Sequence, residues 1–168
     1  MIYYIRHGQT DANLKQIHAG GEWDLPLNNT GRQQAIDLGE KEKDFFASFD
    51  KVFVSPMARA RETAELVTKG TKELNTIHDL REWELGDGSG EPINDDLPPF
   101  LLSLKTPRNG ESFEVFQQRC LNAMRSIASQ SKGKTLIVAH GGVWSCYAHF
   151  VKHPKIELEN CTLIEIDR

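Results

Sequence analysis

The chain has 168 residues, of which 39% are hydrophobic and 26% charged, and this balance predicts one globular domain covering residues 1–168. Lysine and arginine number 20 against 24 aspartates and glutamates, for a net charge of −4. This composition excludes a disordered or collagen-like chain. The mild acidity also speaks against a nucleic-acid-binding protein, which usually carries a strongly basic face.

No segment of the sequence predicts a membrane span or a secretory leader. No apolar run approaches the roughly 20 residues that a spanning helix needs, and Met1–Ile5 begin directly with strand-forming residues. The three cysteines are odd in number and widely spaced, which predicts reduced thiols: Cys120, Cys146 and Cys161. We therefore expect a cytoplasmic protein with no membrane and no nucleic-acid partner.

The hydrophobic pattern predicts strands that alternate with helices. Strands are expected at 2–5, 51–54, 74–77, 134–139 and 161–166. Helices are expected from an N-cap at Thr30 through Phe46, from Pro56 to about Lys69, from Ser112 to about Ser129, and from the glycines after His140 to about Val151. Long loops are expected at 9–29 and 84–111, the second with at most a short helix near 96–104. This alternation predicts an α/β fold, a three-layer sandwich with a mostly parallel central sheet and helices on both faces.

Two of the predicted strands end in the same way. Arg-His-Gly follows the first strand at 6–8, and His-Gly follows the strand at 134–139. In open α/β sheets, ligands bind outside the carboxyl ends of the strands, so both histidines are expected at one crevice. The strand at 51–54 ends toward the same rim, and Arg59 lies in the helix after it. Glycine after each histidine lets backbone or ligand approach closely.

The predicted cluster of Arg6, His7, Arg59 and His140 favours an anionic, tetrahedral ligand. The planar guanidinium fork matches phosphate oxygens. Histidine, with an ordinary pKa of about 6.5, can serve as a neutral nucleophile or as a cationic stabiliser. Packed cations would repel a metal ion, and the spacings lack the cysteine pairs and His-x-x-x-His of zinc sites. We expect neither a metal nor a cofactor.

Six motifs, in order along nearly the whole chain, resemble those of the histidine phosphatase superfamily, also called phosphoglycerate mutase-like. They are Arg6-His7-Gly8-Gln9-Thr10; Asp24-Leu25-Pro26-Leu27-Asn28 with Thr30-Gly31; Ser55-Pro56-Met57-Ala58-Arg59-Ala60; Leu80-Arg81-Glu82 with Gly86-Asp87; Asn109-Gly110-Glu111-Ser112-Phe113; and Ala139-His140-Gly141-Gly142-Val143. Six motifs in one order are a specific signal. The chain most resembles the small phosphatase branch of this family.

The resemblance implies a role for each site residue. His7 would attack phosphorus and become phosphohistidine, while Arg6, Arg59 and His140 hold the oxygens. Glu82 would protonate the leaving oxygen, a contribution of about 10²–10⁴-fold; Glu84 is an alternative acid. Further substrate contacts are expected from Asn13, by the resemblance, and from Thr10, Gly141 and His18.

The segment after Glu82 favours hydrolysis over transfer. Glycolytic mutases of this family hold a second anionic group with a long insertion that includes adjacent arginines. Here 83–111 is short, with Arg108 as its one arginine and six acidic residues, a field that disfavours a second strong anion. We therefore predict a metal-independent phosphatase of histidine acid type, a phosphoric monoester hydrolase that acts on a small phosphorylated metabolite.

Three alternatives stay open at this point. One is phosphoglycerate mutase-type phosphoryl transfer. Another is a signalling phosphatase that acts on phosphohistidine in proteins, although such relatives tend to lack a separate acid. The third is a non-catalytic phosphate-binding module. The identity of the phosphate monoester and the oligomeric state do not follow from the sequence.

Overall fold

The computed structural model of the protein describes residues 1–93, 106–154 and 157–166. The strands are β1 (Ile2–Arg6), β2 (Lys51–Val54), β3 (Leu74–Thr76), β4 (Thr135–Ala139) and β5 (Leu163–Ile166). The α-helices are α1 (Asp11–Leu14), α2 (Asn29–Lys41), α3 (Lys43–Ala47), α4 (Ala58–Val67), α5 (Phe113–Gln130) and α6 (Gly141–Val151). Two 3-10 turns, η1 (His78–Leu80) and η2 (Gly86–Gly88), lie between β3 and α5.

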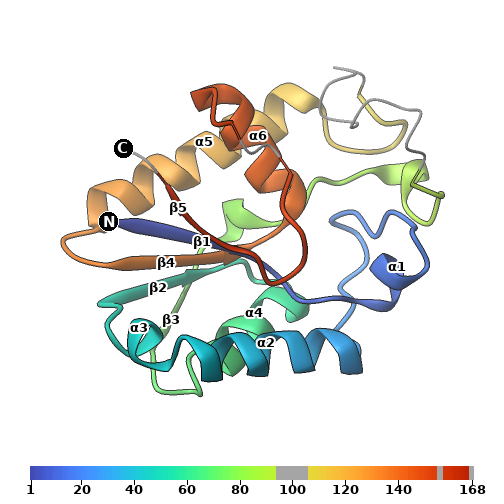
Figure 1. Ribbon diagram of the computed structural model, residues 1–168. Helices are drawn as coiled ribbons and strands as arrows, with labels where there is room; N and C mark the ends of the chain where they lie inside the picture. The colour runs from blue at the N-terminus through green and yellow to red at the C-terminus, as the bar shows by residue number, and fades with distance from the viewer. Residues whose placement is uncertain (94–105, 155–156, 167–168) are drawn as a thin grey trace.

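The strands form one sheet in the order β3-β2-β4-β1-β5 (Figure 1). β1, β2, β3 and β4 run parallel to one another, and β5 pairs antiparallel with β1 at the edge. All five residues of β4 are buried, as expected for the central strand of a parallel sheet. The predicted mostly parallel sheet is confirmed.

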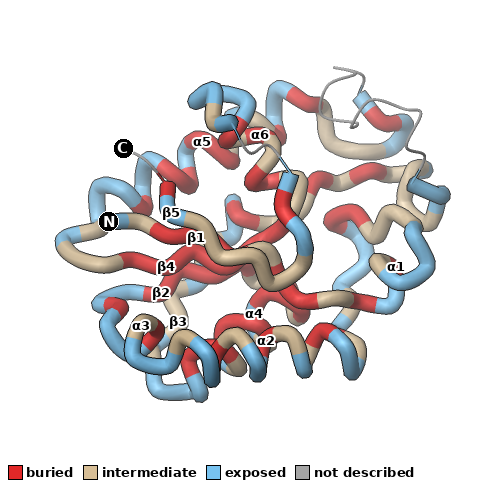
Figure 2. Tube along the Cα trace, viewed as in Figure 1, coloured by how far each residue is buried: buried red, intermediate tan, exposed pale blue. Residues whose placement is uncertain are grey.

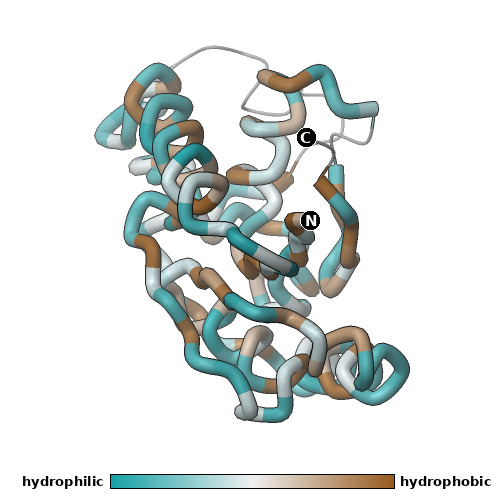
Figure 3. The backbone as a smooth tube through the Cα atoms, turned by 90° about the vertical axis from the view of Figure 1, so that its left-hand side faces the viewer, coloured by the Kyte–Doolittle hydropathy of each residue, from teal (hydrophilic) through white to brown (hydrophobic). Residues whose placement is uncertain are grey.

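Helices cover both faces of the sheet, which confirms the predicted three layers. Alternate strand residues point to opposite faces. Tyr4 and Ile137 pack with α5 and α6, while Ile5 and Val138 pack with α2 and α4. Figure 1 shows α5 and α6 on one side of the sheet and α2, α3 and α4 on the other, and Figure 2 shows the strands between them largely buried. In Figure 3, hydrophobic and hydrophilic residues alternate along the tube, as amphipathic elements require.

The structure corrects three details of the predicted elements. The stretch 9–29, predicted as a loop, contains the short helix α1. Asn28, not Thr30, caps α2: its Oδ1 accepts the N–H of Gly31 at 2.8 Å, and Thr30 lies inside the first turn. The helix predicted through Phe46 is interrupted at Glu42, which separates α2 from α3. The short helix predicted near 96–104 lies outside the described residues.

Two further expectations concerned the state of the cysteines and the presence of membrane-spanning helices. Cys120, Cys146 and Cys161 are free thiols, the first two buried and the third partly buried. Burial raises the pKa of the Cys161 thiol to about 12. Among the described residues, none of the helices has both the length and the apolar character needed to cross a bilayer.

Candidate active site

The pairing of β1 with β4 places His7 beside His140. Arg6 and Ala139 are register partners, and the N–H of His7 donates to the carbonyl of Ala139 at 2.9 Å. Each histidine is therefore the first residue beyond its strand. Their ring centroids lie 5.2 Å apart at an interplanar angle of 62°. The carboxyl ends of these adjacent strands thus bring the two side chains together, as expected.

The imidazole of His7 has one nitrogen engaged and one available. Its Nδ1 lies 2.7 Å from the carbonyl oxygen of Gly8, which can only accept, so Nδ1 carries the proton. Burial lowers the pKa of His7 well below its ordinary value, and the charges of Arg59 and Arg6 lower it further. A neutral ring protonated on Nδ1 presents the lone pair of Nε2, which is the atom a nucleophile needs.

Close backbone packing fixes the loop after His7. The N–H of Gly8 donates to Oγ1 of Thr63 at 3.0 Å, and that hydroxyl donates to the carbonyl of Arg59 at 2.7 Å. A side chain at Gly8 would meet the backbone of Gly31 at the start of α2. The Arg-His-Gly motif is thus tied to both α4 and α2, which explains why glycine is needed after His7.

Arg59 reaches the site from the first turn of α4 and is only 2% exposed. Its Nη1 donates to the carbonyl of Trp23 at 2.9 Å, and its Nη2 to the carbonyl of Gly20 at 3.1 Å. Burial lowers the pKa of Arg59, partly offset by the charge of Glu82. A guanidinium keeps its charge in proteins. The carbonyls of the loop at 20–23 therefore hold a buried positive charge close enough to lower the pKa values of His7 and His140.

Arg6, at the end of β1, is the second arginine of the site. Its Nη1 donates to the carbonyl of Leu158 at 2.5 Å. Its Nε is buried without a hydrogen-bond partner in the described part of the chain, so a donor is left over for a ligand. A side chain at Gly141 would approach this Nε to 3.2 Å. The glycine predicted to contact substrate therefore makes room for the guanidinium of Arg6.

His140 is fully buried at the N-cap of α6. Its Nε2 lies 2.7 Å from Oγ of Ser55, the residue that directly follows β2. Its Nδ1 is buried and, within the described residues, has no hydrogen-bond partner. Burial lowers the pKa of His140 well below its ordinary value, and the charge of Arg59 adds to this. Sequence reasoning missed Ser55, although a polar residue at the end of a buried strand next to β4 was an available signal.

Glu82 lies between η1 and η2, and its side chain reaches the first residues of α6. Its carboxylate accepts the N–H of Gly142 and the N–H of Trp83, each at 3.0 Å. Its negative charge is close enough to raise the pKa values of Arg6 and Arg59 against the effect of burial. Glu84 pairs instead with Arg81 at 3.3 Å, and about half of its side chain is exposed. The geometry therefore favours Glu82 over Glu84 as the acid.

The remaining residues predicted to contact substrate follow His7 in the chain. Thr10 caps α1, and the Oδ1 of Asn13 accepts both the N–H and the hydroxyl of Thr10 at 3.0 Å. With its oxygen so engaged, the amide nitrogen of Asn13 is the group that can donate to an anion. Asn160, which sequence reasoning missed, donates to the carbonyl of His7 at 2.9 Å. Half-buried His18 lies within the field of Glu82, whose charge opposes the lowering of its pKa by burial.

These side chains can bind and transfer a phosphoryl group. Two guanidinium groups supply positive charge. Nε of Arg6 and Nδ1 of His140, both buried and without a partner in the described residues, are nitrogen atoms that could hydrogen-bond to oxyanions. The ring nitrogen of His7 and the carboxyl group of Glu82 are the group types that nucleophilic attack and proton transfer require. No group of three or more histidine, cysteine, aspartate or glutamate side chains within the described residues has an arrangement that could hold a metal ion.

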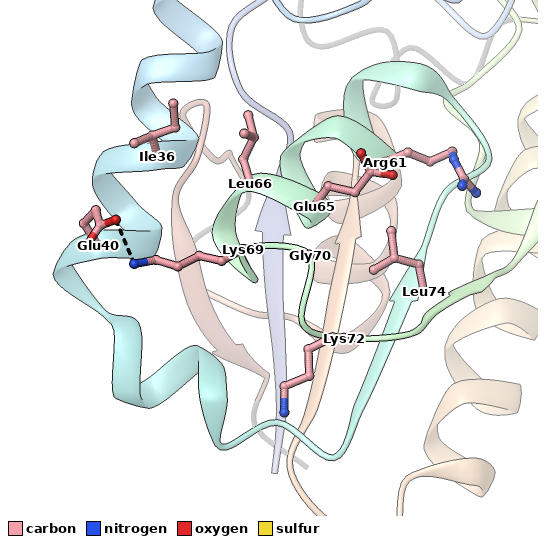
Figure 4. A pocket seen from close by; sticks show the side chains of 9 residues that line it. All are labelled: Ile36, Glu40, Arg61, Glu65, Leu66, Lys69, Gly70, Lys72 and Leu74. Carbon is pink, nitrogen blue, oxygen red and sulfur yellow. Dashed lines mark hydrogen bonds and ion pairs between the residues drawn. The ribbon is translucent and has the colours of Figure 1, made fainter.

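A concave surface lies between α2 and α4, away from these residues (Figure 4). This groove has a volume of about 680 Å³, and the lysine and arginine side chains that line it already have hydrogen-bond or ion-pair partners. Lys69 pairs with Glu40 at 2.7 Å, and Lys72 donates to two backbone carbonyls at 2.7 Å. Arg61 donates to the hydroxyl of Thr76 at 3.2 Å. None of the predicted site residues lines this groove.

The fold, the two strand-end histidines and the arginines beside them are those of the phosphoglycerate mutase-like class. Residues 2–168 match the histidine phosphatase superfamily (branch 1). The chain belongs to this superfamily.

Several similar proteins carry phosphatase names. The chain is 32% identical to an uncharacterized phosphatase, PhoE, of Bacillus subtilis over 97% of this chain and 83% of the relative. It is 31% identical to the broad-specificity phosphatase YOR283W of Saccharomyces cerevisiae, over 99% of this chain and 78% of the relative. The crystal structure of TTHB049 from Thermus thermophilus has a TM-score of 0.76 at 25% identity, covering 96% of this chain and 90% of that one. The relatives support a hydrolase of this superfamily.

Proposed function

We propose that the protein hydrolyses a small phosphate monoester through a phosphohistidine intermediate on His7. The observation that carries this proposal is the hydrogen bond from Nδ1 of His7 to the carbonyl of Gly8, which leaves Nε2 as the nucleophile. Nε2 attacks phosphorus as the leaving oxygen departs. The leaving oxygen takes its proton from Glu82, which afterwards accepts a proton from the water that attacks the phosphohistidine.

Arg6, Arg59 and His140 stabilise the charge of the transferring group. The transition state of phosphoryl transfer is loose and spreads charge over the equatorial oxygens, so fixed donors contribute most of the catalysis. Buried guanidinium groups held by backbone carbonyls need little rearrangement when that charge develops. Asn13 donates to the same phosphoryl group through its amide nitrogen, and Thr10 holds Asn13 in place.

The surroundings of Glu82 favour water as the acceptor of the phosphoryl group. A mutase must hold a second anionic group of its substrate. Arg108 is 87% exposed in its side chain and pairs with Asp87 at 3.5 Å, while Arg81 pairs with Glu84 and donates to the carbonyl of Gly21. The arginines around the acid thus already have anionic or carbonyl partners. We propose a phosphatase rather than a mutase on this ground.

A trapping experiment tests the nucleophile. The purified protein is mixed with ³²P-labelled p-nitrophenyl phosphate and quenched within milliseconds. We expect label on the wild-type protein that is lost in acid and retained in base, and none on His7→Asn. His149→Asn, which changes an exposed histidine, should label like the wild type. Equal labelling of His7→Asn would assign the nucleophile elsewhere. Turnover of 3-phosphoglycerate to 2-phosphoglycerate with negligible phosphate release would replace hydrolysis by mutase activity.

A further inference from the structure

Arg119, in the second turn of α5, occupies an unusual position for a surface-helix arginine. Its side chain is only 18% exposed, and its partner Glu111 is 10% exposed. Nε and Nη2 of Arg119 donate to the two carboxylate oxygens of Glu111, each at 2.7 Å. This two-pronged pairing is the strongest and most directional that the two side-chain types can form.

The remaining donors of Arg119 all go to one short stretch of backbone. Nη1 donates to the carbonyls of Asp79 at 3.0 Å and Arg81 at 2.6 Å, and Nη2 donates to the carbonyl of Glu82 at 3.0 Å. With the two bonds to Glu111, each of the five N–H groups of the guanidinium has an acceptor. One planar, rigid group thus holds the backbone that leads to Glu82 and the carbonyl of Glu82 itself.

Glu111 also binds the two residues that follow Glu82. Its N–H donates to the carbonyl of Glu84 at 2.8 Å, and its carbonyl accepts the indole N–H of Trp83 at 2.9 Å. The indole ring of Trp83 stacks on Phe116 of α5 at a centroid distance of 5.4 Å and an angle of 12°. The segment from 79 to 84 is therefore fixed to α5 and the turn before it, while the carboxylate of Glu82 points to α6.

Burial alone would lower the pKa of Arg119. The hydrogen bond to Glu111 and the nearby carboxylates, Glu82 among them, raise that pKa above its ordinary value. The guanidinium thus stays charged in its largely buried setting, where its central carbon lies 4.8 Å from the ring centroid of Phe116. A neutral or shorter side chain would leave backbone carbonyls without a donor.

We propose that Arg119, held by Glu111, is the positioning residue for the general acid Glu82, and that it acts on the proton-transfer step of the reaction without touching the substrate. This inference rests on the proposed function. A change of about 1 Å in the position of an acid can cost roughly 10²-fold, because proton transfer requires the acid within hydrogen-bond reach of the leaving oxygen.

The test compares two substrates of similar shape whose leaving groups differ in their need for an acid. Phenyl phosphate releases a basic phenolate that needs a proton, and 2,4-dinitrophenyl phosphate releases a stable anion that does not. For Arg119→Met we expect kcat/KM on phenyl phosphate to fall by about 10–100-fold, part of the full value of a general acid, with a change of only about threefold or less on the dinitrophenyl ester. Arg119→Lys keeps the charge but not the planar set of donors, so its kcat/KM on phenyl phosphate should lie between those of the wild type and Arg119→Met. Arg125→Met, an exposed arginine on the same helix, should match the wild type on both substrates.

A double-mutant cycle with Glu82→Gln separates positioning from general damage to the fold. If Arg119 acts through the acid, adding Arg119→Met to Glu82→Gln should cost little more on phenyl phosphate. Equal losses on both substrates, or losses that multiply fully in the double variant, would overturn the proposal. If Arg119→Met does not fold, Arg119→Lys and Glu111→Gln carry the same comparison. A wild-type protein inactive on both esters would contradict the proposed function itself.

Discussion

Oγ of Ser55 lies 2.7 Å from Nε2 of His140, at the carboxyl ends of the adjacent strands β2 and β4. The same oxygen accepts the N–H of Met57 at 3.3 Å. We infer that the hydroxyl of Ser55 donates its proton to Nε2, an arrangement that places the single proton of the neutral His140 ring on Nδ1. Nδ1 is the buried atom that lacks a partner in the described structure, so under the proposed function this tautomer would let Nδ1 donate to a phosphoryl oxygen.

Removing this hydroxyl should weaken transition-state binding. We expect Ser55→Ala to lower kcat/KM by about 5–150-fold, which corresponds to the roughly 1–3 kcal/mol cost of leaving a buried polar group unpaired. Ser129→Ala, at an exposed serine of α5, should have no effect. Nitrogen-15 NMR of the ring gives the tautomer directly. A wild-type signal showing the proton on Nε2 would contradict the assignment.

Gly142 offers a way to disturb Glu82 without weakening the fold. A Cβ at this position would collide with Oε1 of Glu82 and come within 3.0 Å of its Cδ. Because alanine favours a helix over glycine by roughly 0.8–1 kcal/mol, we expect Gly142→Ala to be no less stable than the wild type. Its kcat/KM on phenyl phosphate should nevertheless fall by about tenfold or more, because the carboxylate must move. Urea unfolding and steady-state kinetics measure the two effects.

Gly88→Ala is the matched control for this change. A Cβ at Gly88 would meet only the Cβ of Leu85, at an ordinary contact distance of 3.7 Å. We expect wild-type kinetics from this variant. If Gly142→Ala also retained full activity on phenyl phosphate, the observed position of the Glu82 carboxylate would not be the one used in catalysis.

The part of the site that could be predicted from the sequence lies at strand ends. A short buried strand followed by a histidine fixes that side chain at one edge of a parallel sheet, so the pattern alone predicts that His7 and His140 lie together. Their register, with Arg6 beside Ala139, confirms the placement. The parallel sheet and its two helical layers follow from the alternation of strands and helices.

The part that could not be predicted depends on contacts between segments far apart in the sequence. Arg119 binds the backbone carbonyls of 79–82, about 40 positions away, and a carbonyl acceptor leaves no trace in the residue type that carries it. Asn160 likewise donates to the carbonyl of His7, 153 positions earlier. The helix cap at Asn28 was missed because Thr30 and Asn28 are both good capping residues, and only the path of the chain decides between them.

Lys134 provides a test of stability away from the site. Its Nζ lies 4.1 Å from the ring centroid of Phe45, 5.7 Å from that of Phe49 and 5.8 Å from that of Tyr3. Three rings around the ammonium group of this partly buried lysine should stabilise the fold. We expect Lys134→Met to lower the free energy of unfolding by about 0.5–2 kcal/mol and to leave kcat/KM unchanged. Lys132→Met, two residues earlier and exposed, should leave both unchanged. An unaltered urea midpoint for Lys134→Met would show that these rings contribute no net attraction.

The two active-site histidines make the stability of the fold depend on pH. Burial and the neighbouring arginines lower the pKa values of His7 and His140 well below that of an unfolded histidine, about 6.5. As the pH falls below about 6.5, the unfolded chain binds protons that the folded chain does not, so the free energy of unfolding falls. Each histidine should contribute up to about 1.4 kcal/mol per pH unit in this window. Above the window, both states are neutral and the contribution is constant.

Urea unfolding at pH 7.5, 6.5 and 5.5 measures this slope. We expect His140→Asn to reduce the loss of stability between pH 6.5 and 5.5 by about 1 kcal/mol relative to the wild type, because asparagine binds no proton in either state. His149→Asn, which changes an exposed histidine, should leave the slope as it is. An identical slope in wild type and His140→Asn would mean that His140 takes up its proton as readily in the folded protein as in the unfolded chain. In that case His140 would gain its proton near pH 6.5 in the folded protein, and burial would not keep the ring neutral below that pH.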